Sequence, residues 1–212
     1  MGDQKMKIAV IAANGRTGRI FLDYALARGH ELNAGVHNKN NILGSEKLHI
    51  INCDATNKEE LRNLLKGQDA VVSFIGHVKG SRPWVQSESM KALVEVMNEL
   101  KIKRLVSLTG TGVREHGDKI TLIDRFLNIG IKIIDPKRIN DGIKHAKILK
   151  ASSLDWTILR VTKLQNTTPR PFILKEHGPS KFYVSREDVA RAALEVLEDN
   201  SFIKMLPILS RR

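Results

Sequence analysis

Short apolar runs alternate along this chain with longer segments in which apolar residues recur every three to four positions. The short runs are typical of buried strands, and the longer spacing is typical of amphipathic helices. Strands are expected at about 7–12, 31–36, 48–52, 69–75, 104–109 and 156–160, with a last short one near 205–209. Helices are expected at about 16–28, 57–66, 86–100, 140–152 and 186–198. The pattern therefore predicts an α/β protein.

The starts of two helices carry a further signal. Thr56 with Glu59, and Ser185 with Asp188, have the spacing of a capping box. The run from Ala70 to Ile75 is apolar almost throughout, which suits a strand covered on both faces. Short links between alternating elements favour right-handed crossovers and a parallel sheet. We expect a single Rossmann-type, doubly wound domain over residues 1–212, with strand order 3-2-1-4-5-6 and room for a seventh strand.

Three segments follow the predicted fourth, fifth and sixth strands without a regular pattern, at about 76–85, 110–138 and 161–184. Loops at the carboxyl ends of parallel strands form the ligand crevice of such sheets. These segments are therefore expected to cover a substrate, with 161–184 as a small lid. The amphipathic stretch from Ile120 to Leu127 could cap a substrate or dock a protein partner.

A turn of small residues follows the first predicted strand and opens the first predicted helix. Gly15 and Gly18 are three residues apart, which lets the backbone pass close to a bulky anion. The N–H groups of the first helical turn would then point at that anion. Ala12 stands where the first glycine of this motif is usual. The turn predicts a nucleotide-binding site formed by Ala12, Asn14, Gly15, Arg16, Thr17 and Gly18.

The end of the second predicted strand bears on the choice of cofactor. An NAD site usually has an acidic residue there, but this chain has His37, Asn38 and Lys39. These residues, together with Arg16, suit the 2′-phosphate of NADP(H), and the alternative is a solvated basic loop. Asp54 could accept a hydrogen bond from the adenine amino group or start an Asx turn towards Thr56. Further cofactor-binding candidates at strand ends are Ala55, Phe74, Ile75, Gly76 and Thr109.

Composition narrows the possible partners and location. The chain has 212 residues, 42% of them hydrophobic, and lacks an apolar run of the ~20 residues that a membrane span needs. Its single cysteine, Cys53, suits a reducing cytoplasm. The formal net charge of +12 could favour nucleic acid, but the basic residues are spread out and not interleaved with aromatic residues. We expect a cytoplasmic protein that steers anionic small molecules, with no metal and no membrane or nucleic-acid partner.

The sequence resembles the NmrA-like, NAD(P)H-binding group of atypical short-chain dehydrogenases/reductases, and especially the NADPH-flavin reductases that include biliverdin reductase B. The resemblance covers nearly the whole chain and rests on these segments: 13–18, Cys53–Ala55, Ala70–Gly76, Lys103–Ser107, Ser153–Arg160 and Ser185–Ala190. It implies a Rossmann fold that binds NADPH across the strand ends, with the nicotinamide facing the loops after the fifth and sixth strands.

The sequence departs from that group at the proton donor. Members of the wider family use a Tyr followed four residues later by a Lys, whereas the two tyrosines here, Tyr24 and Tyr183, lack this spacing. Reduction of a carbonyl gains from a positioned acid, but a flavin can take its proton from solvent. The sequence therefore favours a flavin or a similar conjugated acceptor, such as a biliverdin-like tetrapyrrole or a quinone.

Four residues are candidates for the reaction site. Thr109 and Thr111 are expected near the nicotinamide, unless they only satisfy the turn backbone. His145, expected to share one side of a helix with Lys144 and Lys147, could donate a proton or be a surface residue. Lys163 could pair with an anionic substrate group or remain solvated.

Two functions remain open at this stage. One is an NADPH-dependent reductase, and the other is a non-catalytic NADP(H) sensor of the NmrA type that signals to a protein partner. Epimerisation of a nucleotide sugar is a weaker third reading, because it depends on the missing Tyr–Lys pair.

Overall fold

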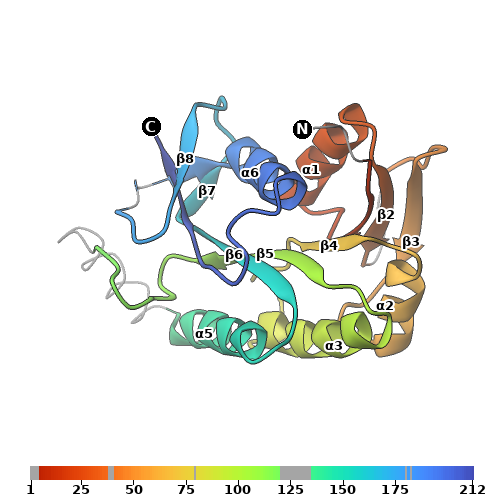
Figure 1. Cartoon of the computed structure of the whole chain (residues 1–212), viewed down its shortest axis with the longest axis horizontal. Helices are drawn as coiled ribbons and strands as arrows, with labels where there is room; N and C mark the ends of the chain where they lie inside the picture. The colour runs from red at the N-terminus through yellow and green to blue at the C-terminus, as the bar shows by residue number, and fades with distance from the viewer. Residues whose placement is uncertain (1–4, 38–40, 79, 120–134, 180, 182) are drawn as a thin grey trace.

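The computed structural model describes residues 5–37, 41–78, 80–119, 135–179, 181 and 183–212. Its centre is an eight-stranded sheet in the order β3-β2-β1-β4-β5-β6-β10-β8 (Figure 1). The main-sheet strands are β1 (Lys7–Ile11), β2 (Glu31–Val36), β3 (Leu48–Asn52), β4 (Ala70–Ser73), β5 (Arg104–Gly110), β6 (Asp155–Val161), β8 (Phe172–Lys175) and β10 (Ile208–Arg211). The helices are α1 (Arg16–Ala27), α2 (Lys58–Leu65), α3 (Val85–Glu99), α5 (Pro136–Lys150) and α6 (Arg186–Glu198).

The predicted fold class and strand order are confirmed. Strands β1 to β6 pair in parallel, β10 adds a seventh parallel strand beside β6, and β8 pairs antiparallel with β10. Each of the five expected helices is present in the described residues and begins and ends within four residues of its expected position. Because the strands are parallel, their carboxyl ends meet at one edge of the sheet, which we call the carboxyl edge.

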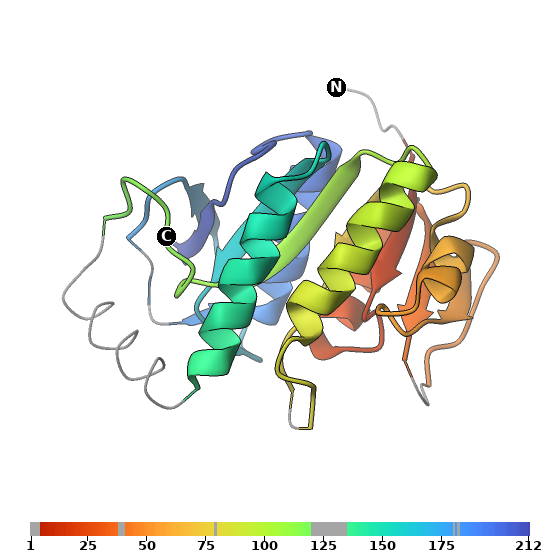
Figure 2. The ribbon, with the colours of Figure 1, turned by 90° about the horizontal axis from the view of Figure 1, so that it is seen from below.

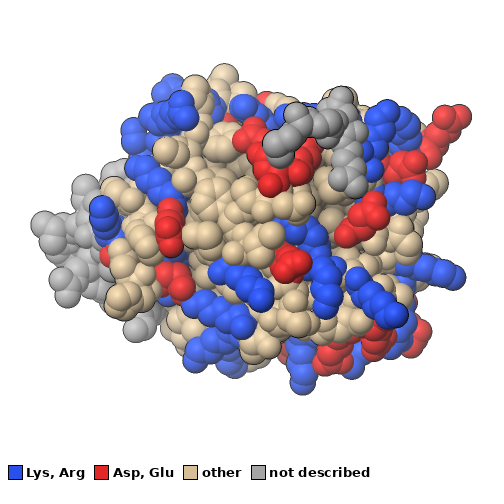
Figure 3. Space-filling view, in the orientation of Figure 1, with Lys and Arg blue, Asp and Glu red and all other residues tan. Residues whose placement is uncertain are grey.

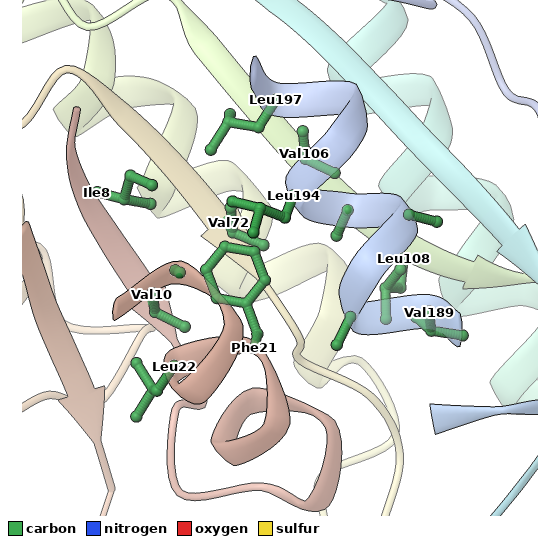
Figure 4. Close-up of a cluster of buried hydrophobic side chains, with 14 of the residues drawn as sticks. Ile8, Val10, Phe21, Leu22, Val72, Val106, Leu108, Val189, Leu194 and Leu197 are labelled. Carbon is green, nitrogen blue, oxygen red and sulfur yellow. The ribbon is translucent and has the colours of Figure 1, made fainter. Parts of the chain in front are cut away.

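Helices cover both faces of the sheet, so each strand sends alternate side chains into two cores. In β1, Ile8 and Val10 pack under α1 and α6, whereas Ala9 and Ile11 pack against α2, α3 and α5. Figures 1 and 2 show the two helix layers, with α1 and α6 on one face and α2, α3 and α5 on the other. Phe21 lies at the centre of the first core (Figure 4), with its ring centroid 5.3 Å from that of Phe74. Burial on both faces explains the continuous apolar runs of the sequence.

The segment 161–184 differs from the expected irregular lid. It contains β8 and also β7 (Lys163–Gln165), which pairs with β9 (Tyr183–Ser185) in a separate two-stranded parallel sheet. These strands have only three or four residues, and β7 and β8 are no more than partly buried, so their apolar pattern is weak in the sequence. The stretch Ile120–Leu127 lies outside the described residues.

The helix caps confirm one expectation in part and correct the other. Ser185 caps α6 by accepting a hydrogen bond from the Glu187 N–H at 3.1 Å, although Asp188 does not complete the capping box and pairs elsewhere. For α2 the cap is Asn57 rather than Thr56, because the Asn57 side chain accepts from the N–H groups of Glu59 and Glu60. An Asn one residue further along competes well with Thr for this role.

A buried arginine ties the loops of the carboxyl edge together. Arg160, at the end of β6, is fully buried and donates to the carbonyls of Val113, Glu176 and Leu206 as well as to the Asp118 carboxylate. Burial opposes ionisation of Asp118, but its bonds to Arg160 hold the pKa of this carboxyl below the usual value. The single guanidinium thus fixes the loop after β5 against the segment after β8.

The charged surface is mixed in sign. On the face seen in Figure 3, Lys and Arg side chains are scattered among Asp and Glu rather than gathered in one stripe. Among the described residues, no helix is both long and apolar enough to cross a membrane.

Candidate cofactor site

The turn between β1 and α1 has the close backbone approach that its glycines predict. Ala12 adopts a φ of 59°, in the left-handed region that favours glycine, and this explains why a glycine is usual there. The Gly15 N–H donates to the Ala12 carbonyl at 3.0 Å. A Cβ on Gly18 would lie 2.6 Å from the same carbonyl oxygen, so α1 can start this close to β1 only with glycine at that position.

In the part of the chain that the structure describes, no side chain caps the N-terminus of α1. Gly15 provides no side-chain cap, and the first turn of α1 contains no acidic residue. The other helices of the described chain are capped by Asn57, Asp135 or Ser185, and α3 is capped by Asp141 from α5. The uncapped N–H groups and the positive end of the α1 dipole therefore face the carboxyl edge, where they can bind an anion.

The loop after β2 lies against this turn. The Asn14 amide donates to the His37 carbonyl at 3.2 Å, and the Arg19 Nε donates to the Asn14 carbonyl at 3.1 Å. The Arg19 guanidinium also bonds the side chain of Asn41. Arg19 was missed by the sequence analysis, although it lies one helical turn after Arg16. Asn38 and Lys39, two of the predicted 2′-phosphate ligands, lie outside the described residues.

The charge of Arg16 acts on the start of α6 rather than on the loop after β2. Arg16 is exposed; the pKa of Arg186, at the start of α6, is lowered first by burial and then by the nearby charge of Arg16. In this conformation Arg19 is the α1 arginine that reaches the loop after β2.

Asp54, after β3, makes the Asx turn that was one of its two expected roles. Its Oδ1 accepts from the Thr56 N–H at 2.9 Å and from the Thr56 hydroxyl at 2.7 Å. Its Oδ2 lies 4.0 Å from His37 Nε2 and 3.7 Å from Arg82 Nη2. Partial burial opposes ionisation of Asp54, but the Thr56 bonds and these two basic groups together keep its pKa below the usual value. The turn leaves Oδ2 facing basic groups, and the adenine role stays a prediction.

Of the remaining predicted cofactor residues, Thr17 lies in the first turn of α1, and the others lie at or just after the ends of β3, β4 and β5. Thr17 and Ala55 are 8% exposed, and Phe74 and Ile75 are half-buried. A Cβ on Gly76 would meet nothing within 4 Å, so the fold itself does not require glycine there. A glycine that packing does not explain suits a site where a ligand approaches the backbone.

The four reaction-site candidates separate in the structure. Thr109 is buried at the end of β5 beside Gly142, where an added Cβ would lie 2.8 Å from the Thr109 Oγ1. Thr111 is half-buried and its N–H donates to the Val161 carbonyl at 3.1 Å. Lys163 is exposed at the start of β7. These three residues lie at or just beyond the carboxyl edge.

The sequence pattern predicted that His145 shares a face of α5 with Lys144 and Lys147. This prediction is wrong. The two lysines are exposed, whereas His145 is 1% exposed and points into the protein, with its Nε2 3.1 Å from the Ser107 Oγ. Burial lowers the pKa of His145 to about 4, although Asp141 opposes this. His145 is therefore neutral near pH 7 and packs between α5 and the sheet.

Neither tyrosine lies on α5. Tyr24, in α1, donates its hydroxyl to Glu187, and Tyr183, in β9, packs under the guanidinium of Arg211. The inner side of α5 instead carries Asp141 and His145, which are both buried. Within the described chain, the side of the sheet that would receive a nicotinamide thus has no tyrosine acid on α5.

Comparison with known proteins agrees with this geometry. The sequence profile of a family described as NAD(P)H-binding matches residues 12–200. A short-chain dehydrogenase/reductase from Veillonella parvula, solved in complex with NADP, is similar with a TM-score of 0.78 and 18% identity, covering 98% of this chain and 94% of its own. A Streptococcus pneumoniae protein assigned as an NADH-flavin reductase is similar with a TM-score of 0.77 and 23% identity, covering 98% and 100%. ChuY, an anaerobilin reductase from Escherichia coli O157:H7, is similar with a TM-score of 0.77 and 16% identity, covering 97% of each chain.

Proposed function

Because the chain belongs to the NAD(P)H-binding family, we propose that it is an NADPH-dependent reductase that passes hydride to a flavin or a similar conjugated acceptor. Tetrapyrroles of the biliverdin type and quinones have the same kind of extended π-system. The observation that carries this proposal is the combination of an open phosphate turn with an α5 that lacks a tyrosine acid.

The phosphate turn supports binding of the cofactor's pyrophosphate. The uncapped N–H groups of α1 face the carboxyl edge, and Gly15 and Gly18 keep side chains away from them. The preference for NADPH is supported by the basic groups near the end of β2, which include His37 and Arg19. Arg19 can reach a 2′-phosphate by exchanging its neutral partner Asn41 for the anion, since a charge-assisted bond is the stronger one.

The absence of a tyrosine acid from α5 supports a flavin or a similar conjugated molecule as the electron acceptor. NADPH supplies the hydride, and the chain's own contribution would be to hold the acceptor over the carboxyl edge and to exclude water. Positioning of this kind can supply several kcal/mol of the barrier without a proton donor. In this proposal Thr109 and Thr111, at the carboxyl end of β5 and just beyond it, would contact the reacting rings, and the exposed Lys163 would contact an anionic group of the acceptor.

NADPH oxidation tests the proposal directly. Absorbance at 340 nm is followed with FMN, riboflavin and a quinone as acceptors, and NADH is run in parallel. We expect turnover with the flavins and a higher kcat/KM for NADPH than for NADH. Tight NADPH binding without turnover on any acceptor would contradict the reductase and favour the NADP(H) sensor.

In the same assay, the variant Gly15→Asp tests whether the phosphate turn binds the cofactor. Gly15 is the N-cap of α1 with extended backbone angles (φ −69°, ψ 162°), a position where Asp is among the best capping residues. The new carboxylate would satisfy the helix and repel the pyrophosphate. A Cβ at this position would lie 3.1 Å from the Ala12 carbonyl oxygen, so the turn must shift slightly to accept it. We expect the variant to remain folded, as circular dichroism can check, and to lose at least about 90% of NADPH-dependent turnover, because one unfavourable contact of about 1.4 kcal/mol already costs a factor of ten. Turnover that survives this substitution would mean that the phosphate turn is not the cofactor site.

A further inference from the structure

A cleft of about 410 Å³ opens between α1 and the N-terminal end of α6. Its walls come from Ile20 on α1, from residues 166–169 after β7, and from residues 185–187 at the start of α6. None of the candidates named from the sequence lines it. The cleft is large enough for a phosphate or carboxylate group together with part of the molecule that carries it.

Arg186 is the cation of this cleft and lacks an acidic partner in the described chain. It is only 8% exposed, and its Nη1 donates to the Asn166 Oδ1, a neutral acceptor, at 2.6 Å. The two neighbouring acids are engaged elsewhere: Glu187 accepts from Tyr24, and Asp188 accepts from the Arg170 N–H and lies 3.5 Å from Arg211. A mostly buried cation without a counter-charge is costly, so a bound anion would stabilise it.

The surroundings of Arg186 also favour a bound anion. Burial, and then the charge of Arg16, lower the pKa of Arg186. Two arginines on facing helices repel each other unless an anion lies between them.

The cleft lies at the edge where the cofactor is proposed to bind. Ile20 is one helical turn after Arg16, so the two share a face of α1 that leads from the phosphate turn into the cleft. Residues 166–169 continue from the end of β6 through Thr162, Lys163 and β7, which is the segment expected on the acceptor side.

We propose that this cleft binds a phosphate or carboxylate group of the electron acceptor, with Arg186 as the main ligand. The inference rests on the proposed function and narrows it: the protein selects acceptors with an anionic side chain over neutral acceptors with the same ring system. FMN and riboflavin form the ideal pair of probes, because they share the isoalloxazine ring and differ only in the phosphate.

Binding of the two flavins tests the proposal without any turnover. Quenching of flavin fluorescence is titrated with protein saturated with NADP⁺, which cannot reduce the flavin. We expect FMN to bind about tenfold more tightly than riboflavin, the effect of one charge-assisted contact. In Arg186→Gln this preference should fall to about onefold, with riboflavin affinity unchanged. Arg191→Gln, on the same helix but beside Phe172 with 5.4 Å from guanidinium carbon to ring centroid, is the control and should keep the preference.

A second variant guards against loss of folding in the first. Asn166→Asp places a carboxylate beside Arg186 and neutralises it from within the protein, so it should remove the FMN preference while preserving Arg186 packing. Equal affinity of the parent for FMN and riboflavin, or an unchanged preference in Asn166→Asp, would overturn the proposal. A loss of NADP⁺ affinity in both variants would also overturn it, because the cleft would then serve the cofactor. Since no turnover is needed, these outcomes are separate from the failure of the reductase assay.

Discussion

At the residue scale, Arg19 is the proposed ligand of the 2′-phosphate, although it lies outside the sequence motif. Its Nε is held by the Asn14 carbonyl, so its guanidinium is fixed between the phosphate turn and Asn41 in the loop after β2. Arg16 is inside the motif, but it is exposed and its charge acts on Arg186. The spacing of residues on α1 does not distinguish the two arginines, because their direction depends on what packs around each one.

We predict that Arg19→Gln lowers the preference for NADPH over NADH about fivefold, the effect expected of one partly exposed charged contact. The measurement is the ratio of kcat/KM values for the two cofactors with FMN as acceptor. Arg28→Gln, at the opposite end of α1, serves as the control and should leave the ratio as it is. If Arg19→Gln weakens both cofactors equally, Arg19 contacts the pyrophosphate rather than the 2′-phosphate.

At the scale of elements, α5 holds α3 in place through one buried carboxylate. Asp141 is fully buried and accepts from the N–H groups of Gln86 and Ser87, both at 2.9 Å, and from the Ser87 hydroxyl. Its Oδ2 also lies 2.9 Å from His77 Nε2, which ties down the loop after β4. The N-terminus of α3 is thus capped by a side chain of the neighbouring helix α5. The same carboxylate also fixes the loop after β4, which flanks the proposed cofactor site.

We predict that Asp141→Asn lowers the free energy of unfolding by about 3 kcal/mol, because an amide NH₂ would face a backbone donor and the negative charge would be lost. Denaturant titration with circular dichroism measures this change. The control is Asp135→Asn at the start of the same helix, where the side chain makes a single capping bond of 3.1 Å to Arg138. Asn caps helices about as well as Asp, so the control should cost less than about 0.5 kcal/mol. An equal cost for both substitutions would refute the role given to Asp141.

At the scale of the whole molecule, one of the two hydrophobic cores contains a buried, neutral histidine. His145 belongs to the layer of α3 and α5, where its Nδ1 has no hydrogen-bond partner and its Nε2 meets Ser107. The pKa of about 4 lies below the usual value near 6.5. The unfolded chain therefore binds more protons than the folded one between these two pH values, and stability must fall as the pH is lowered through this window.

We predict that His145 accounts for about 2 kcal/mol of the stability lost between pH 7 and pH 5. Unfolding free energies of the parent and of His145→Gln are compared at the two pH values, so that contributions of the carboxylates cancel. His49→Gln, at an exposed position of β3, is the control and should lose stability with acid as the parent does. The same acid sensitivity in His145→Gln as in the parent would show that His145 is not the group responsible.

Local patterns in the sequence determined the α/β class, the parallel sheet order and the position of the phosphate turn. These features depend on apolar periodicity and on glycine spacing, which act over a few neighbouring residues. The sequence also placed Thr109 and Lys163 near strand ends, because parallel strands bring those ends together. The short strands β7, β8 and β9 were missed, since strands of three or four residues leave little apolar pattern.

Only the tertiary structure decided which side chains meet. The burial of His145, the cap that Asp141 provides to α3, and the contact of Arg19 with Asn41 all join residues from different elements. Arg186 is part of a segment that resembles the family, but its sequence neighbours do not show that it is buried without an acid. Side-chain direction, burial and pairing are set by packing between elements, and packing is a property of the folded chain rather than of any local stretch of it.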